Sequence, residues 1–92
     1  MTENELKHAV LRIARLNGWM QYNQPQRSMR SAGDHGFPDL VLARGGRAVF
    51  MELKTEVGLQ SALQHAWSQE LPNYHLIRPR DLASGLVNEL LA

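Results

Sequence analysis

Residues 36–54, GFPDLVLARGGRAVFMELK, hold the pattern that predicts the centre of the fold. Two largely apolar runs flank the dipeptide Gly45-Gly46. A two-residue hairpin turn of this kind needs positive φ at both central positions, and glycine adopts positive φ without steric cost. The stretch therefore predicts a β-hairpin with strands over residues 38–43 and 47–54.

The predicted turn also says which side chains share a face of the hairpin. If Gly45-Gly46 is the whole loop, Asp39 falls directly opposite Glu52 on the neighbouring strand. Lys54 lies two residues after Glu52 and points from the same face. A three-residue turn would shift this pairing. The opposite face is apolar and is expected to build the core, with Leu40, Leu42, Val49, Met51 and Leu53.

The charged residues at the open end of the hairpin form a candidate catalytic group. Two facing carboxylates repel each other and lower stability, and a divalent cation between them would turn that repulsion into attraction. Carboxylate oxygens with open water positions suit Mg²⁺ or Mn²⁺. Such a metal lowers the pKa of bound water, and a nearby lysine can orient or activate that water. Asp39, Glu52 and Lys54 therefore form a group of the kind that can cleave phosphodiester bonds.

The same residues also allow a purely structural interpretation. Asp39 and Glu52 could be strand-end acids paired with Arg44, Arg47 or Lys54, as surface ion pairs that contribute little stability. A lysine at a strand edge such as Lys54 also discourages aggregation.

The first helix is predicted over residues 2–18, with Thr2 as N-cap and Glu5 completing a capping box. Its core face is predicted from spacings of three and four residues and consists of Leu6, Ala9, Val10, Ile13 and Leu16. Its polar face is predicted to consist of Lys7, Arg12 and Arg15.

The remaining elements complete an α/β (α+β) fold with the order α-β-β-β-α-β-α, a mixed sheet flanked by helices. They are a strand at 19–23, a helix at 59–71, a strand at 74–78 and a closing helix at 80–92 interrupted at Gly85. We expect the covered side of the second helix to include Leu59, Leu63, Ala66 and Trp67. Residues 24–36 have no periodicity and are predicted to form a long surface loop.

Composition restricts the class of protein. The 92 residues form one small domain, 1–92, and the 43% hydrophobic and 21% charged residues are ordinary for a soluble globular protein. The lack of cysteine excludes disulfides and thiolate metal sites and is typical of a reducing compartment such as the cytoplasm. No apolar run approaches the roughly 20 residues that span a bilayer, so no membrane association is expected.

Basic residues near the predicted site are candidates for contacts with DNA phosphates. Arg27 and Arg30 lie in the long loop, and Arg44 lies next to the glycine turn. Arginine at such positions can neutralise phosphate groups, although a solvated loop explains it as well. The four histidines are scattered without the spacing of paired metal ligands.

The stretch resembles the PD-(D/E)XK nucleases, through Pro38-Asp39 and the later Glu52-Leu53-Lys54. The wider layout is similar to the VRR-NUC (virus-type replication-repair nuclease) branch of that superfamily. It shares an N-terminal helix, a glycine before PD in GFPD, GGR in the turn, ELKT, and a following helix that carries a glutamine. The resemblance extends from about Glu3 to the strand before Pro79, and it implies a restriction-endonuclease-like fold.

The resemblance also implies roles for individual residues. Asp39 and Glu52 would hold Mg²⁺ or Mn²⁺ with help from the Leu53 carbonyl, and Lys54 would serve the attacking water. Gln64 matches the glutamine of the following helix.

The family also places a glutamate on the first helix, and two residues of this chain are candidates. Glu3 is favoured because it lies toward the covered face of that helix. Glu5 lies away from the covered face and is expected to cap the helix instead.

Together these expectations describe a metal-dependent endonuclease that hydrolyses DNA phosphodiesters. The resemblance implies selectivity for branched DNA such as Holliday junctions, a role in replication, repair and recombination, and a homodimer in a bacterial or phage-infected cell. A dimer would also supply core area that a short chain lacks. The alternatives are a catalytically inactive nucleic-acid-binding module and a nuclease subunit that needs a partner.

Overall fold

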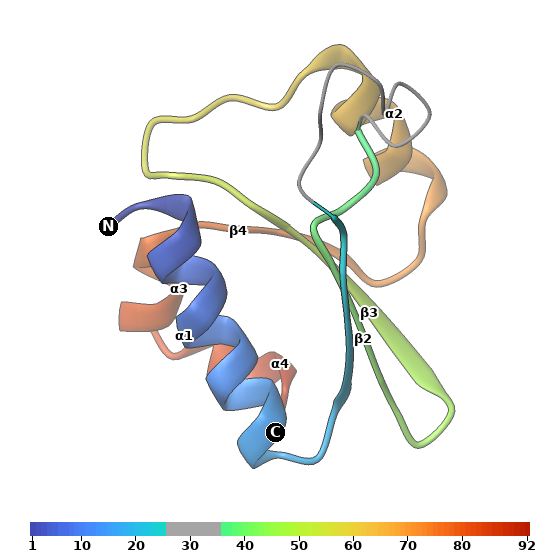
Figure 1. Cartoon of the computed structure of the whole chain (residues 1–92). Helices are drawn as coiled ribbons and strands as arrows, with labels where there is room; N and C mark the ends of the chain where they lie inside the picture. Colours follow the sequence, from blue (N-terminus) through green and yellow to red (C-terminus); the bar gives the residue numbers. More distant parts are fainter. Residues whose placement is uncertain (26–35) are drawn as a thin grey trace.

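The computed structural model is a mixed α+β fold in which helices flank a four-stranded mixed sheet (Figure 1). The predicted fold class, a mixed sheet flanked by helices, is confirmed. It describes residues 1–25 and 36–92. The helices are α1 (Glu3–Leu16), α2 (Ala62–Glu70), α3 (Pro79–Ala83) and α4 (Leu86–Leu90). The strands are β1 (Met20–Asn23), β2 (Leu40–Arg44), β3 (Arg47–Leu53) and β4 (Tyr74–Ile77).

The predicted hairpin is the centre of the sheet, whose strand order is β1-β2-β3-β4. Gly45 and Gly46 have φ of 59° and 78° and form the whole loop, because Arg44 pairs with Arg47 directly beside it. The predicted register is therefore confirmed, and the apolar face that it implied is buried in the core. One detail differs from the expectation: β2 begins at Leu40, so Asp39 lies just before the ladder.

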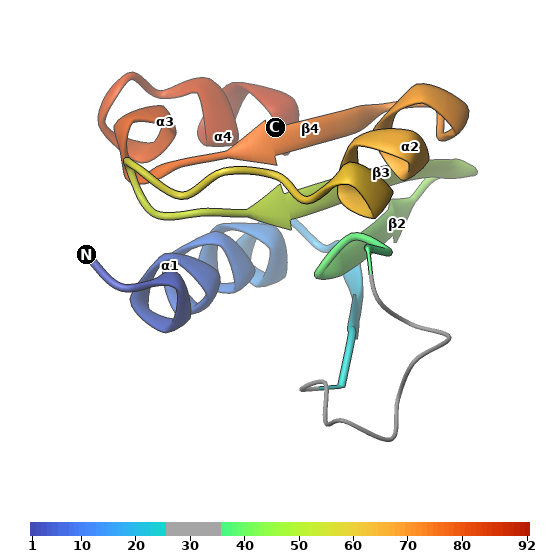
Figure 2. The same cartoon turned by 90° about the horizontal axis from the view of Figure 1, so that it is seen from above.

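The other two strands complete a mixed sheet. β1 runs antiparallel to β2, whereas β4 runs parallel to β3. A parallel pair needs a crossover connection, and α2 lies in the chain between β3 and β4. Figure 2 shows α2 well separated from α1, with β3 between them.

The hydrophobic core lies between the apolar face of the hairpin and the helices α1 and α4. The capping box of Thr2 and Glu5 starts α1 as predicted. The buried face of the helix is rotated from the predicted one and consists of Leu6, Val10, Leu11 and Ala14. Leu16 is 76% exposed because the chain turns away at Gly18, whose φ is 79°. The closing helical segment divides at Gly85 (φ 85°), as predicted.

The turn end of the hairpin is tied to the C-terminal segment through Trp19. The indole Nε1 of this buried residue donates a hydrogen bond of 2.9 Å to the carbonyl of Leu91. The guanidinium groups of Arg44 and Arg47 lie 4.5 Å and 5.2 Å from the centre of the indole ring. This end of the hairpin is therefore a structural cluster of an aromatic ring and two cations.

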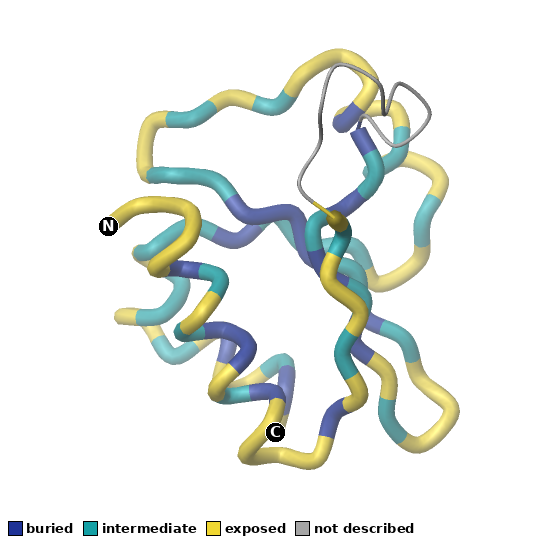
Figure 3. Tube along the Cα trace, in the orientation of Figure 1, coloured by how far each residue is buried: buried dark blue, intermediate teal, exposed yellow. Residues whose placement is uncertain are grey.

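The second helix begins later and faces a different way than predicted. Ser61 is its N-cap, so Leu59 lies in the preceding segment and is 83% exposed. Leu63 and Ala66 are also exposed, and Trp67 is half-buried. The buried residue of α2 is Gln64, and the dark and light segments of Figure 3 show how little of this helix is covered. The expected apolar face was wrong because α2 packs through a polar contact.

Within the described residues, no helix has the length and apolar character needed to cross a membrane.

We predict that Trp19→Phe lowers the free energy of unfolding by about 2–4 kcal/mol, measured by urea denaturation. The change removes the donor to the buried Leu91 carbonyl and weakens the contact with the two guanidinium groups. The control is Trp67→Phe at the half-buried position in α2, where a loss of about 1 kcal/mol or less is expected. Equal losses in the two variants would contradict the structural role assigned to Trp19.

Candidate active site

Among the described residues, Glu52 is the buried acidic residue, with 1% of its surface exposed. It lies near the end of β3 and points away from the apolar core, toward α2. A buried carboxylate is costly unless hydrogen bonds or an opposite charge compensate for lost water. Gln64 supplies one such bond, since its Nε2 donates to Glu52 Oε2 at 2.8 Å.

The orientation of the Gln64 amide is set by the start of its own helix. Its Oε1 accepts a hydrogen bond of 2.8 Å from the backbone N–H of Ser61, and the Ser61 hydroxyl accepts one from the Gln64 backbone N–H. The amide oxygen must face the N–H donor, so the NH₂ group must face Glu52. A helix cap thus aims a hydrogen-bond donor at the buried carboxylate.

Lys54 follows β3 directly and brings a positive charge to Glu52. Its backbone N–H donates to the Ile77 carbonyl at 3.0 Å, which extends the β3–β4 pairing by one residue. Its ammonium group lies 3.9 Å from Glu52 Oε2, and only 14% of its side chain is exposed. Lys54 is therefore a largely enclosed lysine rather than a free edge residue.

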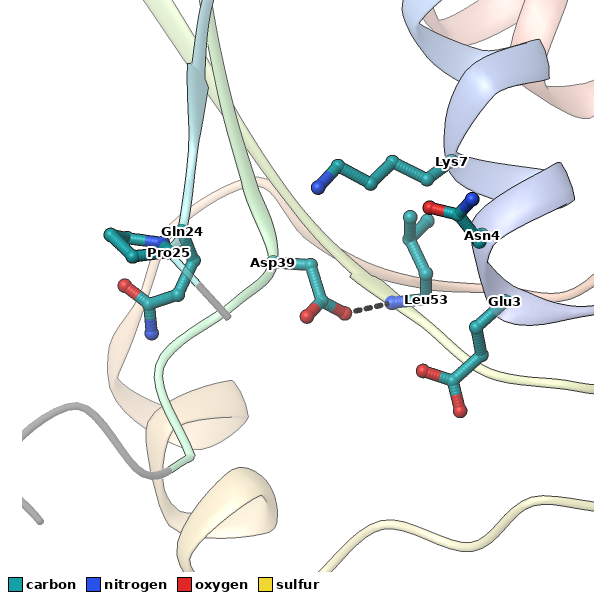
Figure 4. A pocket seen from close by; sticks show the side chains of 7 residues that line it. All are labelled: Glu3, Asn4, Lys7, Gln24, Pro25, Asp39 and Leu53. Carbon is teal, nitrogen blue, oxygen red and sulfur yellow. Dashed lines mark hydrogen bonds between the residues drawn. The ribbon is translucent and has the colours of Figure 1, made fainter. Parts of the chain in front are cut away.

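Asp39 is held beside this network by its neighbours on two strands. Its Oδ2 accepts a hydrogen bond of 2.8 Å from the backbone N–H of Leu53 (Figure 4). Its carbonyl accepts a second one, also of 2.8 Å, from the backbone N–H of Gln24. Leu53 stands between Glu52 and Lys54 in the sequence. Its backbone N–H therefore links Asp39 to the chain segment that carries the other two predicted residues. The contact seen for Leu53 is made by its amide, and the predicted use of its carbonyl stays a prediction.

A cavity of about 550 Å³ opens beside Asp39. Its lining comes from the first two turns of α1, the end of β1 and the ends of the hairpin strands, and consists of Glu3, Asn4, Lys7, Gln24, Pro25, Asp39 and Leu53. The Glu3 carboxylate borders this cavity, whereas the Glu5 carboxylate accepts from the Thr2 backbone at 2.8 Å (Figure 4). Of the two helix-one acids considered from the sequence, the structure brings Glu3 near Asp39.

Asp39 and Glu52 carry carboxylates, the ligand type that hard divalent cations prefer. Mg²⁺ is usually bound through one or two carboxylates while it keeps several waters. No group of three or more His, Asp or Glu side chains in the described ranges converges as a metal-binding cage. Binding of Mg²⁺ or Mn²⁺ at Asp39 and Glu52 therefore stays a prediction.

Tyr74 is a member of the site that sequence reasoning missed. It pairs with Phe50 in the β3–β4 ladder, and its hydroxyl accepts a hydrogen bond of 2.8 Å from Gln60. Burial, together with the negative charges of Glu52 and Asp39, raises the pKa of Tyr74 to about 12, although the bond from Gln60 opposes the rise. The only signal in the sequence was its place at the start of the strand beside β3.

A close approach between Gly36 and α2 brings the segment before Asp39 against the helix that carries Gln64. Gly36 has φ of 89°, and a Cβ built there would lie 2.9 Å from the backbone carbon of Leu63. Next to it, the ring of Phe37 packs edge-on against Trp67 and Phe50, with ring centres 5.1 Å and 6.2 Å away. The close contact with α2 therefore explains why a glycine stands at the first position of GFPD.

Of the three predicted DNA-binding arginines, Arg44 lies within the described residues. Arg27 and Arg30 lie outside the described residues. Arg44 lies at the turn end of β2, where its guanidinium donates to the carbonyls of Asn17 and Ala92 at 2.8 Å and 2.6 Å. Its contacts in the structure serve the fold, and its predicted role in DNA binding has no support from its position.

Comparison of the chain with protein-family models, with curated proteins and with solved structures found no match.

We predict that Gly36→Ala destabilises the protein more than Gly46→Ala does, measured by urea denaturation. Both positions have positive φ, which costs an alanine about 1–2 kcal/mol. Gly36→Ala also forces a Cβ against the Leu63 backbone, which adds about 1–3 kcal/mol, whereas Gly46 has open space around it. Equal losses in the two variants would contradict the close approach of α2.

The raised pKa of Tyr74 predicts a loss of stability in alkaline solution. The pKa is about 12 in the folded protein against an ordinary 10.0, so folding favours the protonated phenol. Its contribution is fully present below pH 10 and is lost as the pH rises from 10 to about 12. We expect Tyr74→Phe to show a smaller fall of unfolding free energy over this range than Tyr22→Phe at an exposed tyrosine. Identical pH profiles would contradict this assignment.

Proposed function

We propose that the chain is a metal-dependent DNA endonuclease of the PD-(D/E)XK type, similar to the VRR-NUC branch. One observation carries the proposal. The buried carboxylate of Glu52 is hydrogen-bonded by Gln64 and flanked by the Lys54 ammonium, while Asp39 is anchored on the intervening Leu53 amide at the rim of a cavity.

The geometry argues against the structural interpretation of these acids. The pair of Glu52 with Lys54 that this interpretation allows is present, but both side chains are largely enclosed rather than exposed at the surface. Arg44 and Arg47 lie instead against Trp19 at the far end of the hairpin. Glu52 is almost fully buried, in a small domain where space for apolar side chains is limited. A buried charged group is weak support for stability, because apolar residues of similar size often serve stability as well or better. A chemical role accounts for its presence in this position.

The chain's own residues have distinct tasks in this proposal. Gln64 holds the Glu52 carboxylate in one orientation, because its amide is fixed by the Ser61 cap. Lys54 is placed to hold a proton or stabilise negative charge next to Glu52, and its enclosure strengthens that electrostatic effect. When bound, Mg²⁺ or Mn²⁺ would supply an acidic water and stabilise charge on phosphate. Asp39 and Glu52 are its proposed ligands, and Glu3 adds a carboxylate to the cavity that Asp39 lines.

The proposed substrate is DNA, with branched forms such as Holliday junctions preferred, and the proposed assembly is a homodimer. A two-fold dimer would present two sites to two strands of a junction. These two statements rest on the resemblance of the motif and on the small size of the chain. The proposed setting is DNA replication, repair and recombination in the cytoplasm of a bacterial or phage-infected cell.

We predict that Lys54→Ala reduces DNA cleavage by at least about 100-fold while DNA binding persists, because the lysine acts on the reaction rather than on affinity. The assay incubates labelled linear duplex and labelled four-way junction with Mg²⁺, with Mn²⁺ and with chelator. Wild-type cleavage is expected only with a divalent metal. Arg15→Ala, on the exposed side of α1, is the matched control and should cut normally.

The same assay separates the proposal from its two alternatives. Cleavage retained by purified Lys54→Ala would refute the assigned chemistry. A wild-type protein that shifts the DNA without cutting it in any buffer would instead be a binding module. Cleavage that requires added host extract would indicate a subunit that needs a partner.

A further inference from the structure

Lys7 lines the cavity opposite Asp39, although its place in the sequence assigned it to the solvated side of α1. Figure 4 shows its side chain extending from α1 into the cavity, toward the wall that carries Asp39. Lys7 is half-buried, whereas Arg12 and Arg15 on the same helix are exposed. This lysine is therefore set apart from the other cations of α1.

The Lys7 ammonium also does not form the ion pair with Glu3 that their spacing on the helix allows. Glu3 lies four residues earlier, and a glutamate followed by a lysine at that spacing is the favoured order for an ion pair on a helix. Across residues 1–25 and 36–92, the ion pairs are those of Lys54 with Glu52 and Arg80 with Glu56. Lys7 thus places a positive charge over the cavity without neutralising a carboxylate of its own wall.

Asn4 adds a second donor beside Lys7, in a cavity that the carboxylates of Glu3 and Asp39 also line. Asn4 lies one helical turn before Lys7 on the same face, and its amide also lines the cavity. An ammonium group and a side-chain amide are typical donors to the oxygens of a nucleic-acid backbone. The cavity volume of about 550 Å³ is in the usual range for bound small groups.

We infer that Lys7 and Asn4 form a phosphate-binding subsite, which holds a backbone phosphate of the DNA next to the one that is cut. The inference rests on the proposed function and extends it, because it assigns the α1 wall of the cavity to substrate positioning. Lys7 lies across the cavity from Asp39, so its task is to bind and orient the strand rather than to take part in hydrolysis.

The test is the affinity of Lys7→Gln for a labelled duplex and a labelled four-way junction, in chelator, over a range of salt concentrations. We expect binding about tenfold weaker than wild type, the loss of one charged hydrogen bond. The slope of log affinity against log salt should fall by about 0.9, the value for one phosphate contact on duplex DNA. Lys7→Arg keeps the charge and should restore both values.

Arg12→Gln and Arg15→Gln are the matched controls, since each removes one positive charge from the exposed side of the same helix. Both should retain the wild-type salt slope. In cleavage with Mg²⁺, Lys7→Gln should raise KM about tenfold and leave kcat within about twofold, as expected for lost ground-state binding. Unfolding in urea checks that all the variants are equally folded.

Three outcomes would overturn the inference: a wild-type salt slope in Lys7→Gln, an equal loss in Arg12→Gln or Arg15→Gln, or a fall in kcat at unchanged KM. A wild-type protein that binds DNA but does not cut it refutes the endonuclease, while the salt-slope comparison still decides the subsite. A wild-type protein that binds neither the duplex nor the four-way junction refutes both the endonuclease and the phosphate-binding subsite.

Discussion

The hydrogen bond between Gln64 and the buried Glu52 carboxylate is the contact on which the arrangement of the candidate active site depends. Glu52 stands near the end of β3 with 1% of its surface exposed, so its carboxylate is almost entirely removed from water. A carboxylate in that position needs donors, and α2 supplies one from a side chain that its own first turn holds in place. The helix therefore docks through a polar contact, with Gly36 allowing the close approach and Phe37 packing beside it. The same arrangement that satisfies the carboxylate leaves Lys54 enclosed next to it.

The two ends of the hairpin have different physical characters. At the turn end, Trp19 joins the sheet to α4 by a buried hydrogen bond and two contacts with arginine, all of which favour a fixed fold. At the open end, acids and a lysine share a small volume, and the raised pKa of Tyr74 reflects both burial and the negative charge gathered there. Titratable groups with shifted pKa values are characteristic of functional sites. Structural ion-pair networks shift pKa values as well. The α1 wall of the cavity adds Glu3 and Lys7 from a part of the chain remote in sequence.

The sequence predicted the hairpin well because its signals are local. Two adjacent glycines set the turn, and the period-two alternation of apolar residues allows one register only. The capping box of α1 and the break at Gly85 were predicted for the same reason, since each depends on a few consecutive residues. The covered face of α2 was predicted wrongly, because apolar spacing takes no account of a buried carboxylate on another strand. The place of Lys7 was missed likewise, since a helical wheel separates core from surface but does not show a cavity.

Residue types and their order along the chain were thus enough to select Asp39, Glu52 and Lys54 as a group and to place them at one end of a hairpin. Their environment followed from contacts between distant segments: the burial of Glu52, the orientation of Gln64, the anchoring of Asp39 on the Leu53 amide and the opening of the cavity toward α1. The physical reason is the range of the interactions. Turn geometry and strand alternation act over a few residues, whereas desolvation and the pairing of charges depend on which helix covers which face of the sheet.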